Sequence, residues 1–485
     1  MHSYKMVFPE LRSLKRVHII GVCGTLMGAF AAYLRRRGVE VTGSDQNVYP
    51  PMSDILREAG VKLMDGYRAE HISAGHRPDL VVIGNVIRSD NPEARAAIDS
   101  GLVYSSLPEA MEKLFLVDTR NLVVAGTHGK TTTSSLLSYT LDYCGKDPSY
   151  FMGGVSHDLP HSFHVANINS GNYFVLEGDE YDTAFWDKVP KFNHYLPDDV
   201  ILTSIEYDHA DIYPNIESVV KAFSGLLTRI RPNGRLIACL DFPLVRDLVL
   251  KSKVSTLTYA SAATKEARFV PEKVRNEKGM TRFEVLDGHR VVDELAIQLP
   301  GNHNVLNALS VWIECRELGL EQEKVREAFR KFRGVKRRQE IRGEIGGVLV
   351  IDDFAHHPTA VRETLKALRA RYPDRRLISV FEPRSATSRR KVFQNDYAMA
   401  FRESDLVFIS APYDQSRIAE DDQFSSEMLV SDLTHQGTPA ALMETVDDGV
   451  QDVAKVSKSG DLIAVLSNGG FGGFIPKLLK ALGTR

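Results

Sequence analysis

The sequence has no hydrophobic run long enough to cross a bilayer, few cysteines and no excess of charge of either sign. Residues Met1 to Arg16 contain no apolar segment of the kind found in a signal peptide. Lys and Arg together number 60, and Asp and Glu together number 63. The resulting net charge of −3 gives the chain no general attraction to nucleic acid or to an anionic membrane. We therefore expect no nucleic-acid partner and no membrane partner.

The four cysteines are scattered along the chain, and no two of them have the CxxC spacing of a metal or redox site. They are Cys23, Cys144, Cys239 and Cys315. Isolated thiols are typical of proteins in a reducing compartment. Together with the missing signal peptide, they predict a soluble, cytoplasmic protein.

What the sequence does contain is enough apolar material for several cores, since hydrophobic residues make up 43% of its 485 residues. At about 150 residues per domain, this length favours roughly three domains. Three segments alternate short β-branched runs with helical patterns, as parallel α/β sheets do. The expected strands are 17–20, 39–42, 80–83 and 103–105, then 122–125, 173–176, 201–204 and 235–240, then 348–351, 377–381, 406–410 and 462–466.

One stretch departs from this alternation. Residues 254–299 change between apolar and polar in short runs, which predicts a small antiparallel piece within the second segment. We place the domain limits near residues 119 and 340. The expected domains are therefore 1–119, 120–340 and 341–485.

The strongest local signal is the segment Gly126-Thr127-His128-Gly129-Lys130-Thr131-Thr132, which follows an apolar strand and precedes a helical pattern. This order suits a phosphate loop, because glycines let backbone N–H groups close around phosphates and the helix N-terminus adds positive partial charge. Lys130 would neutralise the outer phosphates of ATP, and the Thr131 hydroxyl would ligate Mg²⁺. The spacing departs from GxxxxGK[ST], since only two residues separate Gly126 from Gly129.

A second glycine-containing turn lies between the first expected strand and a helix. Its candidate ligand-binding residues are Gly21, Gly24, Thr25 and Gly28, with Asp45 at the end of the next strand. The position resembles a dinucleotide-binding turn, but the spacing is GxxGxxxG. From the residues alone, a nucleotide-diphosphate site and a structural turn fit equally well.

Charged residues also follow two expected strands of the second segment. Glu177 opens the run EGDEYD, and His209 lies in the run EYDHAD. The carboxyl ends of parallel strands are where ligands bind in open α/β sheets, and magnesium takes hard oxygen ligands beside phosphates. One of these acids and the histidine are thus candidate metal ligands, with a solvated loop as the alternative interpretation.

In the third segment, the run DDFAHHP, which contains Asp353, His356 and His357, follows an expected strand. These side chains could hold a ribose, a metal or a reacting amine. Arg384 and Ser385 end the next strand, and the guanidinium fork of Arg384 suits a carboxylate. The alternative is that each run merely ends a strand.

The order of motifs GTHGKTTT, EGDEYD, DHADIYP, GNHNVLNAL, RRQE and DDFAHHPTAV resembles that of the Mur ligases of bacterial cell-wall synthesis, over almost the whole chain. The resemblance implies a Rossmann-like N-terminal domain that binds a UDP substrate. It further implies a central P-loop ATPase-type α/β domain and a Rossmann-like C-terminal domain that brings in an amine. It also implies ATP and Mg²⁺ as cofactors.

The same resemblance assigns roles by motif position. Glu177 and His209 would ligate magnesium, and Asn304 and Asn307 of GNHNVLN would face adenine. Arg338 of RRQE and Asp353 would reach the phosphates or the ribose across a domain hinge. The reaction would pass through an acyl phosphate, and His356, His357 or Asp353 could deprotonate the amine.

The stretches GVCGTLMG, EGDEYDTAFWDK, FEPRS and SNGGFGG resemble those of family members that act in peptidoglycan recycling. These members join UDP-N-acetylmuramate to the murein tripeptide L-alanyl-γ-D-glutamyl-meso-diaminopimelate. Arg384-Ser385 is closer to the turn of ligases that bind diaminopimelate than to the histidine-arginine pair of L-alanine ligases. A UDP-N-acetylmuramate–L-alanine ligase stays as the alternative. A P-loop kinase or ATPase and a non-catalytic nucleotide sensor are the two more distant ones.

Overall fold

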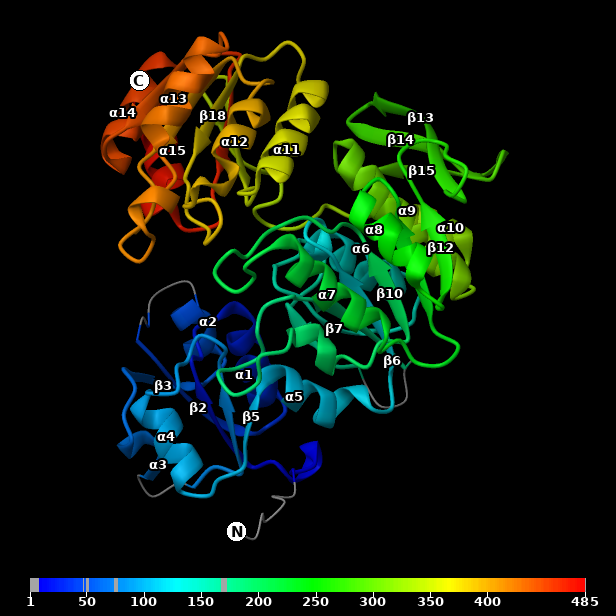
Figure 1. Ribbon diagram of the computed structural model, residues 1–485, viewed down its shortest axis with the longest axis vertical. Coiled ribbons are helices and arrows are strands. Elements are labelled where there is room, and N and C mark those ends of the chain that lie inside the picture. Colours follow the sequence, from blue (N-terminus) through cyan, green and yellow to red (C-terminus); the bar gives the residue numbers. More distant parts are fainter. Residues whose placement is uncertain (1–7, 47, 49–51, 74–76, 167–171, 485) are drawn as a thin grey trace.

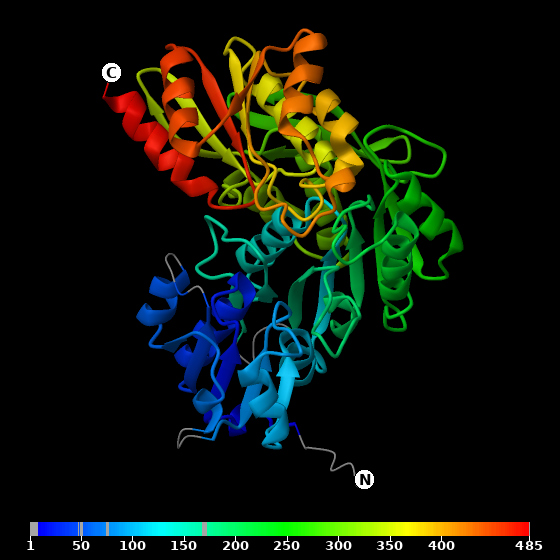
Figure 2. The same cartoon turned by 60° about the vertical axis from the view of Figure 1, so that its left-hand side comes forward.

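The computed structural model describes residues 8–46, 48, 52–73, 77–166 and 172–484. Over these residues the chain forms three α/β lobes in sequence order, with sheets of five, ten and six strands. The first and third lobes lie at opposite ends of the long axis, and the second lobe lies between them (Figures 1 and 2). This architecture confirms the predicted fold class.

The first lobe has a fully parallel sheet in the order β3-β2-β1-β4-β5. Its strands are β1 (Arg16–Ile20), β2 (Glu40–Asp45), β3 (Lys62–Asp65), β4 (Leu80–Ile83) and β5 (Tyr104–Ser106). Its helices are α1 (Thr25–Arg36), α2 (Met52–Glu58), α3 (Glu70–Ser73), α4 (Pro92–Asp99) and α5 (Leu107–Met111), with the short 3-10 helix η1 (Leu11–Ser13) and the π-helix η2 (Glu112–Leu116). The sequence did not predict β3, because this edge strand is short and carries no fully buried residue.

The second lobe has a mixed sheet in the order β15-β14-β13-β12-β11-β10-β6-β9-β7-β8. Its strands are β6 (Arg120–Ala125), β7 (Ser149–Phe151), β8 (Phe163–His164), β9 (Tyr173–Gly178), β10 (Asp199–Leu202), β11 (Arg235–Cys239), β12 (Ser255–Tyr259), β13 (Phe269–Glu277), β14 (Met280–Asp287) and β15 (Arg290–Ile297). Its helices are α6 (Lys130–Tyr143), α7 (Ile216–Leu227), α8 (Pro243–Lys251), α9 (Asn302–Glu317) and α10 (Gln322–Lys331), with the short helix η3 (Lys191–His194). The expected antiparallel piece is present as β13 to β15, but β12 pairs with β11 in parallel.

The third lobe has the strand order β16-β17-β21-β18-β19-β20, in which only the edge strand β16 is antiparallel. Its strands are β16 (Glu340–Ile345), β17 (Val348–Asp353), β18 (Leu377–Phe381), β19 (Leu406–Ser410), β20 (Ala440–Met443) and β21 (Leu462–Leu466). Its helices are α11 (Pro358–Arg371), α12 (Gln394–Ala400), α13 (Ser426–His435), α14 (Val446–Val456) and α15 (Phe474–Gly483), with the short turns η4 (Lys391–Phe393), η5 (Glu420–Asp422) and η6 (Phe471–Gly473).

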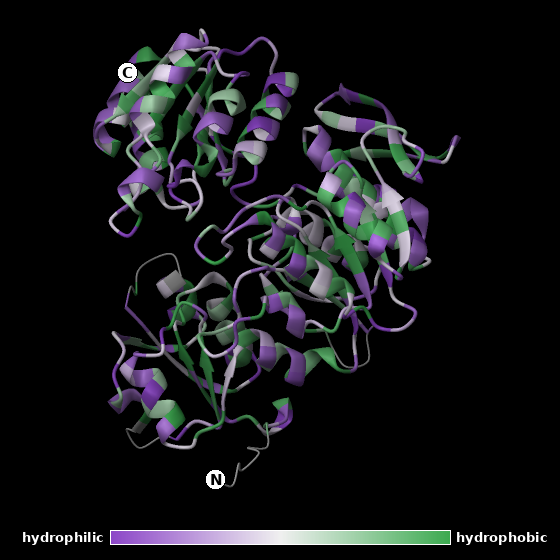
Figure 3. Cartoon of the chain, viewed as in Figure 1, coloured by the Kyte–Doolittle hydropathy of each residue, from purple (hydrophilic) through white to green (hydrophobic). Residues whose placement is uncertain are grey.

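The cores follow from the two-residue period of a strand. In β17, Leu349 and Ile351 join one apolar cluster with α11 to α13, whereas Val348 and Val350 join another with α14 and α15. A parallel strand covered on both faces is apolar throughout, which is why these strands could be recognised in the sequence. Figure 3 shows the hydrophobic strands inside each lobe and the hydrophilic faces of the helices outside.

The contacts between lobes differ in kind. The first and second lobes share one apolar cluster, in which the rings of Tyr33 and Phe163 lie 4.8 Å apart. The second and third lobes are joined by polar contacts, among them the bond from Thr387 Oγ1 to Asp208 Oδ1 at 2.6 Å. The four cysteines are free thiols. Within the described ranges, no helix is long and apolar enough to span a membrane.

Candidate active site

The segment from Gly126 to Thr132 forms a tight loop between β6 and the start of α6. Gly126 has φ = 135°, and a Cβ atom there would lie 2.2 Å from Thr203 Oγ1. Gly129 has φ = 80°, and a Cβ atom there would lie 2.6 Å from Asn307 Oδ1. Both positions therefore require glycine for space and for backbone conformation. The loop opens onto the N-terminus of α6, as a phosphate loop must.

Lys130 lies folded over this loop. Its Nζ donates to the Gly126 carbonyl at 2.6 Å and to Glu180 Oε2 at 2.9 Å. Although burial opposes the charged form, Glu180 raises the pKa of Lys130. A cation held at the loop by a single buried carboxylate is placed to exchange that partner for phosphate oxygens.

Two of the predicted metal ligands meet beside the loop. Thr131 Oγ1 donates to Glu177 Oε1 at 2.8 Å, and the Gly153 N–H donates to Glu177 Oε2 at 2.7 Å. These hydroxyl and carboxylate oxygens fit Mg²⁺. The meeting follows from the sheet order, because β6, β9 and β10 are neighbours and their carboxyl ends share one edge.

His209, the third predicted ligand, contacts Glu180, the carboxylate that also binds Lys130. Its Nε2 is 3.1 Å from Glu180 Oε1. Although burial favours the neutral ring, Glu180 and Asp208 raise the pKa of His209 to about 9. A protonated imidazole has no lone pair for a metal, so His209 fits a metal only after it loses this proton.

His128 of the loop connects the second lobe to the third. Its Nε2 lies 2.6 Å from Glu206 Oε2, and its ring centre lies 4.8 Å from that of His357. His128, Glu206 and His357 could together offer three metal-ligand atoms. However, both nitrogens of His357 are already engaged, with the Tyr207 carbonyl and the Thr359 N–H at 3.2 Å each. The cluster is therefore a contact between lobes.

The loop that follows β10 receives further contacts from the third lobe. Thr359 Oγ1 donates to Glu206 Oε1 at 3.0 Å, and the Ala210 N–H donates to Thr387 Oγ1 at 3.2 Å. His356 donates from Nδ1 to the Phe354 carbonyl at 3.0 Å, and its Nε2 lies 3.7 Å from Asp208 Oδ2. The third lobe thus holds the loop that carries His209.

Asp353 and Arg338 lie at the passage between the second and third lobes. Asp353 accepts from the Gln339 N–H at 2.8 Å and from the Ala355 N–H at 2.7 Å. Burial raises the pKa of Asp353, while Arg338 acts in the opposite direction. The guanidinium of Arg338 lies 4.9 Å from the centre of the Phe354 ring.

The two predicted asparagines lie on the face of α9 that meets the phosphate loop. Asn304 Nδ2 donates to the Pro300 carbonyl at 2.8 Å, and Asn307 Nδ2 donates to Asn304 Oδ1 at 3.3 Å. Asn307 also closes over Gly129. Both side chains are buried.

Arg384 and Ser385 follow β18. Arg384 Nη1 donates to Glu382 Oε1 at 3.2 Å, and its guanidinium lies 3.9 Å from the centre of the Tyr413 ring. Ser385 Oγ donates to Ser388 Oγ at 2.9 Å. Glu382 and Tyr413 thus fix the orientation of the Arg384 guanidinium, and its other N–H groups can still donate to an anionic partner.

The turn predicted in the first lobe is ordered by Asp45, whose Oδ2 accepts from the Cys23 N–H at 2.9 Å. Gly21 and Gly28 flank this turn, and Gly24 and Thr25 line a cavity of about 260 Å³. Second-lobe residues, among them Gly153 and Lys191, also line it. The cavity therefore extends from the first-lobe turn to Gly153, whose N–H donates to Glu177 Oε2.

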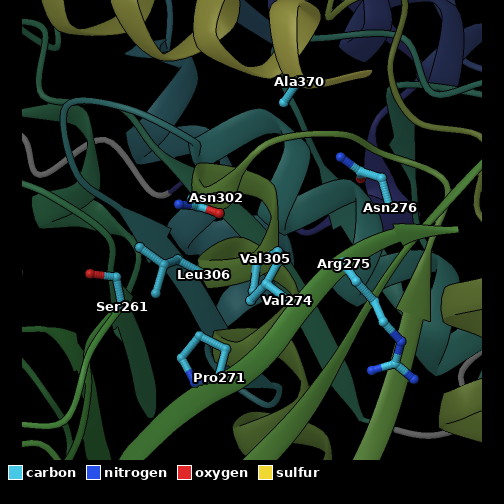
Figure 4. A pocket seen from close by; sticks show the side chains of 9 residues that line it. All are labelled: Ser261, Pro271, Val274, Arg275, Asn276, Asn302, Val305, Leu306 and Ala370. Carbon is cyan, nitrogen blue, oxygen red and sulfur yellow. The ribbon is translucent and has the colours of Figure 1, made fainter. Parts of the chain in front are cut away.

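A second cavity, of about 370 Å³, lies on the opposite face of α9 (Figure 4). It is lined by Ser261, Pro271, Val274, Arg275, Asn276, Asn302, Val305, Leu306 and Ala370. It contains none of the predicted site residues and no acidic group or histidine.

Comparison with known proteins shows the family. The model of the Mur ligase family catalytic domain matches residues 16–118, that of the Mur ligase middle domain residues 124–314, and that of the Mur ligase glutamate ligase domain residues 337–469. The chain belongs to the Mur ligase family. This Mur ligase is an enzyme that forms amide bonds at the expense of ATP.

Individual relatives carry two different names. The UDP-N-acetylmuramate–L-alanyl-γ-D-glutamyl-meso-2,6-diaminoheptandioate ligase of Escherichia coli (strain K12) is 39% identical over 475 residues, which covers 96% of this chain and 98% of that protein. A UDP-N-acetylmuramate–L-alanine ligase of Carboxydothermus hydrogenoformans is 31% identical over 460 residues, with 95% of each chain covered. The crystal structure of a murein peptide ligase from Psychrobacter arcticus gives a TM-score of 0.71 at 32% identity, with coverage of 97% of this chain and 99% of that one.

The structure of this ligase also shows partners that the sequence did not single out. Glu180 pairs with Lys130, Glu206 with His128, and Lys191 with Asp179. Glu180 and Asp179 lie in a run recognised as acidic, but the sequence gave no sign of which acid faces which base. Lys191 follows no expected strand, and it becomes a candidate site residue only because it lines the cavity between the first and second lobes.

Proposed function

We propose that this Mur ligase joins UDP-N-acetylmuramate to L-alanyl-γ-D-glutamyl-meso-diaminopimelate, with ATP and Mg²⁺, in peptidoglycan recycling. The observation that carries the choice of acceptor is Arg384, which Glu382 and Tyr413 orient at the end of β18. A guanidinium held in this way suits a carboxylate, and the tripeptide has several. The name of the Escherichia coli relative supports the same acceptor.

The proposed division of labour follows the lobes. Residues 1–119 would bind the UDP substrate, residues 120–340 would bind ATP, and residues 341–485 would bring in the peptide. The proposed ATP-binding residues are Gly126, Thr127, His128, Gly129, Lys130, Thr131, Thr132, Asn304, Asn307, Arg338 and Asp353. The proposed UDP-substrate residues are Gly21, Gly24, Thr25, Gly28 and Asp45, and the proposed peptide residues are Arg384 and Ser385.

Thr131, Glu177 and His209 would hold the magnesium ion, which supplies positive charge beside the phosphates when it is bound. Lys130 would leave Glu180 for the phosphates. The Thr131 hydroxyl and the Glu177 carboxylate already point at one another, at 2.8 Å. An ion between them would replace the hydrogen bond from Thr131 to Glu177.

The reaction then proceeds by two nucleophilic substitution steps. An oxygen of the muramate carboxylate attacks the γ-phosphorus of ATP, the bond from this phosphorus to the β,γ-bridging oxygen breaks, and ADP leaves. The amine nitrogen attacks the acyl carbon, the bond from this carbon to the phosphate oxygen breaks, and phosphate leaves. The protein contributes mainly by positioning the reactants and by neutralising charge.

His356 is the proposed acceptor of the amine proton. Because its Nδ1–H donates to the Phe354 carbonyl, the neutral ring has its lone pair on Nε2. Asp208 Oδ2, 3.7 Å from Nε2, would stabilise the imidazolium that forms. His357 is less suitable because both of its nitrogens are occupied.

The test is phosphate release with UDP-N-acetylmuramate and two alternative acceptors, the tripeptide and L-alanine, with the product identified by mass. A higher kcat/KM for the tripeptide is expected. A higher kcat/KM for L-alanine would assign the enzyme to the other class of relatives. Phosphate release that needs no acceptor would contradict ligation altogether.

A further inference from the structure

Lys191 is a basic side chain in the cavity between the first and second lobes, and the roles proposed above do not use it. It opens the short helix η3, and its side chain is only 14% exposed. Its backbone N–H donates to the Tyr181 carbonyl at 2.9 Å, which fixes the start of this helix. A lysine this far from solvent needs an anionic partner.

Its partner in the protein is Asp179, whose Oδ2 lies 2.6 Å from Lys191 Nζ. An ammonium has three donors, and among the described residues Asp179 is the one hydrogen-bond acceptor found for it.

The neighbouring residue holds the other lysine of the site. Glu180 pairs with Lys130 of the phosphate loop, and Asp179 pairs with Lys191 of the cavity. Two consecutive carboxylates thus hold one ammonium at the phosphate loop and a second in the cavity between lobes. A ligase that joins a phosphoryl donor to a carboxylate must bring two anions together, and it needs a cation for each.

The cavity leads from the proposed UDP-substrate turn to a second-lobe residue that binds the proposed metal ligand Glu177. Gly24 and Thr25 line it on the first-lobe side, and Gly153, whose N–H binds Glu177, lines it on the second-lobe side. A UDP-sugar acid bound at the turn would have its carboxyl end in this space. Lys191 lines the same space.

On the basis of the proposed function, we infer that Lys191 binds the lactyl carboxylate of UDP-N-acetylmuramate and holds it for attack on the γ-phosphate. Asp179 is a positioning residue that aims the ammonium. Lys191 is thereby the residue that distinguishes the sugar acid from UDP-N-acetylglucosamine, which has the same nucleotide and amino sugar but no carboxylate.

The experiment measures the affinities of the protein for UDP-N-acetylmuramate and for UDP-N-acetylglucosamine by calorimetry. The full-length wild type should prefer the acid, and Lys191→Met should lose about 10- to 100-fold in affinity for the acid, which is the worth of one charge-assisted hydrogen bond. Its affinity for UDP-N-acetylglucosamine should stay within about twofold. The matched control is Lys188→Met, because Lys188 is 65% exposed and pairs with Asp182 in the same segment. It should behave as the wild type.

Removing Lys191 alone leaves Asp179 unpaired, so a second variant separates binding from folding. The double variant Asp179→Asn with Lys191→Met carries no unpaired charge and should still bind both nucleotides alike. Recovery of the preference for the acid in this variant would overturn the inference, as would an equal loss of affinity for both nucleotides in Lys191→Met. A wild type that binds both nucleotides equally would also overturn it. Preferential binding of the acid without amide formation from the tripeptide would refute the proposed function and leave the role of Lys191 standing.

Discussion

Arg384 offers the sharpest test of the acceptor. We expect Arg384→Ala to reduce kcat/KM for the tripeptide and to leave the KM for ATP nearly unchanged. A bidentate pair with a carboxylate contributes two charge-assisted hydrogen bonds of about 1.5–3 kcal/mol each, or about 10²- to 10⁴-fold together. Because the side chain is 29% exposed, solvent screens part of this interaction, and we expect a loss of about 10²-fold.

A second variant displaces the same guanidinium without removing its charge. A Cβ atom on Gly469 would lie 2.1 Å from Arg384 Cδ and Nε, so Gly469→Ala must move the arginine. Gly469→Ala should also reduce kcat/KM for the tripeptide and leave the KM for ATP nearly unchanged, with a smaller loss than Arg384→Ala. Arg402→Ala, at an exposed arginine of the same lobe, is the control.

The assay couples ADP release to NADH oxidation at saturating ATP and UDP-N-acetylmuramate, with the tripeptide varied. The reasoning is refuted if Arg384→Ala keeps tripeptide kcat/KM within about threefold of the wild type. It is equally refuted if the KM for ATP rises by the same factor, since Arg384 would then act on the nucleotide site.

Three further predictions concern other parts of the molecule. Lys130→Ala should lower kcat by about 10²–10³-fold while circular dichroism stays native, and near-normal turnover would remove the loop from the mechanism. Glu177→Gln and His209→Ala should each raise the magnesium concentration needed for half-maximal rate, and an unchanged requirement in both would place the metal elsewhere. Burial opposes protonation of His194, but Glu112 and Asp187, each 2.8 Å from a ring nitrogen, raise its pKa. Its stabilising effect is therefore complete below about pH 6.5 and is lost as pH rises through the folded-state pKa, so the Tm difference between wild type and His194→Gln should shrink toward alkaline pH.

The sequence predicted the parts of this fold that repeat a simple physical pattern. Helix α11 starts at Pro358 because proline suits the first position of a helix, and its buried residues Val361, Leu365 and Leu368 recur on one face. Interior strands such as β4 and β21 are continuous apolar runs, whereas the edge strands β3 and β16 mix polar and apolar residues. Edge strands bury only part of their surface, so composition does not mark them.

The same limit applies to the site. Glu177 and His209 could be chosen because Glu177 lies near the carboxyl end of β9 and His209 follows β10, and these strand ends share one edge of the sheet. The pairing of Lys130 with Glu180 joins residues 50 positions apart, and that of Asp179 with Lys191 depends on where a short helix starts. Such pairings are decided by tertiary packing, which no local pattern records.

The crowding around Gly126 and Gly129 also bears on how this enzyme could escape an inhibitor. Any side chain at either position would collide with Thr203 or Asn307. A compound whose contacts were confined to the backbone N–H groups of this loop would therefore face a surface with few tolerated substitutions. Resistance substitutions would have to occur at surrounding residues, where they would not change the conformation of the loop.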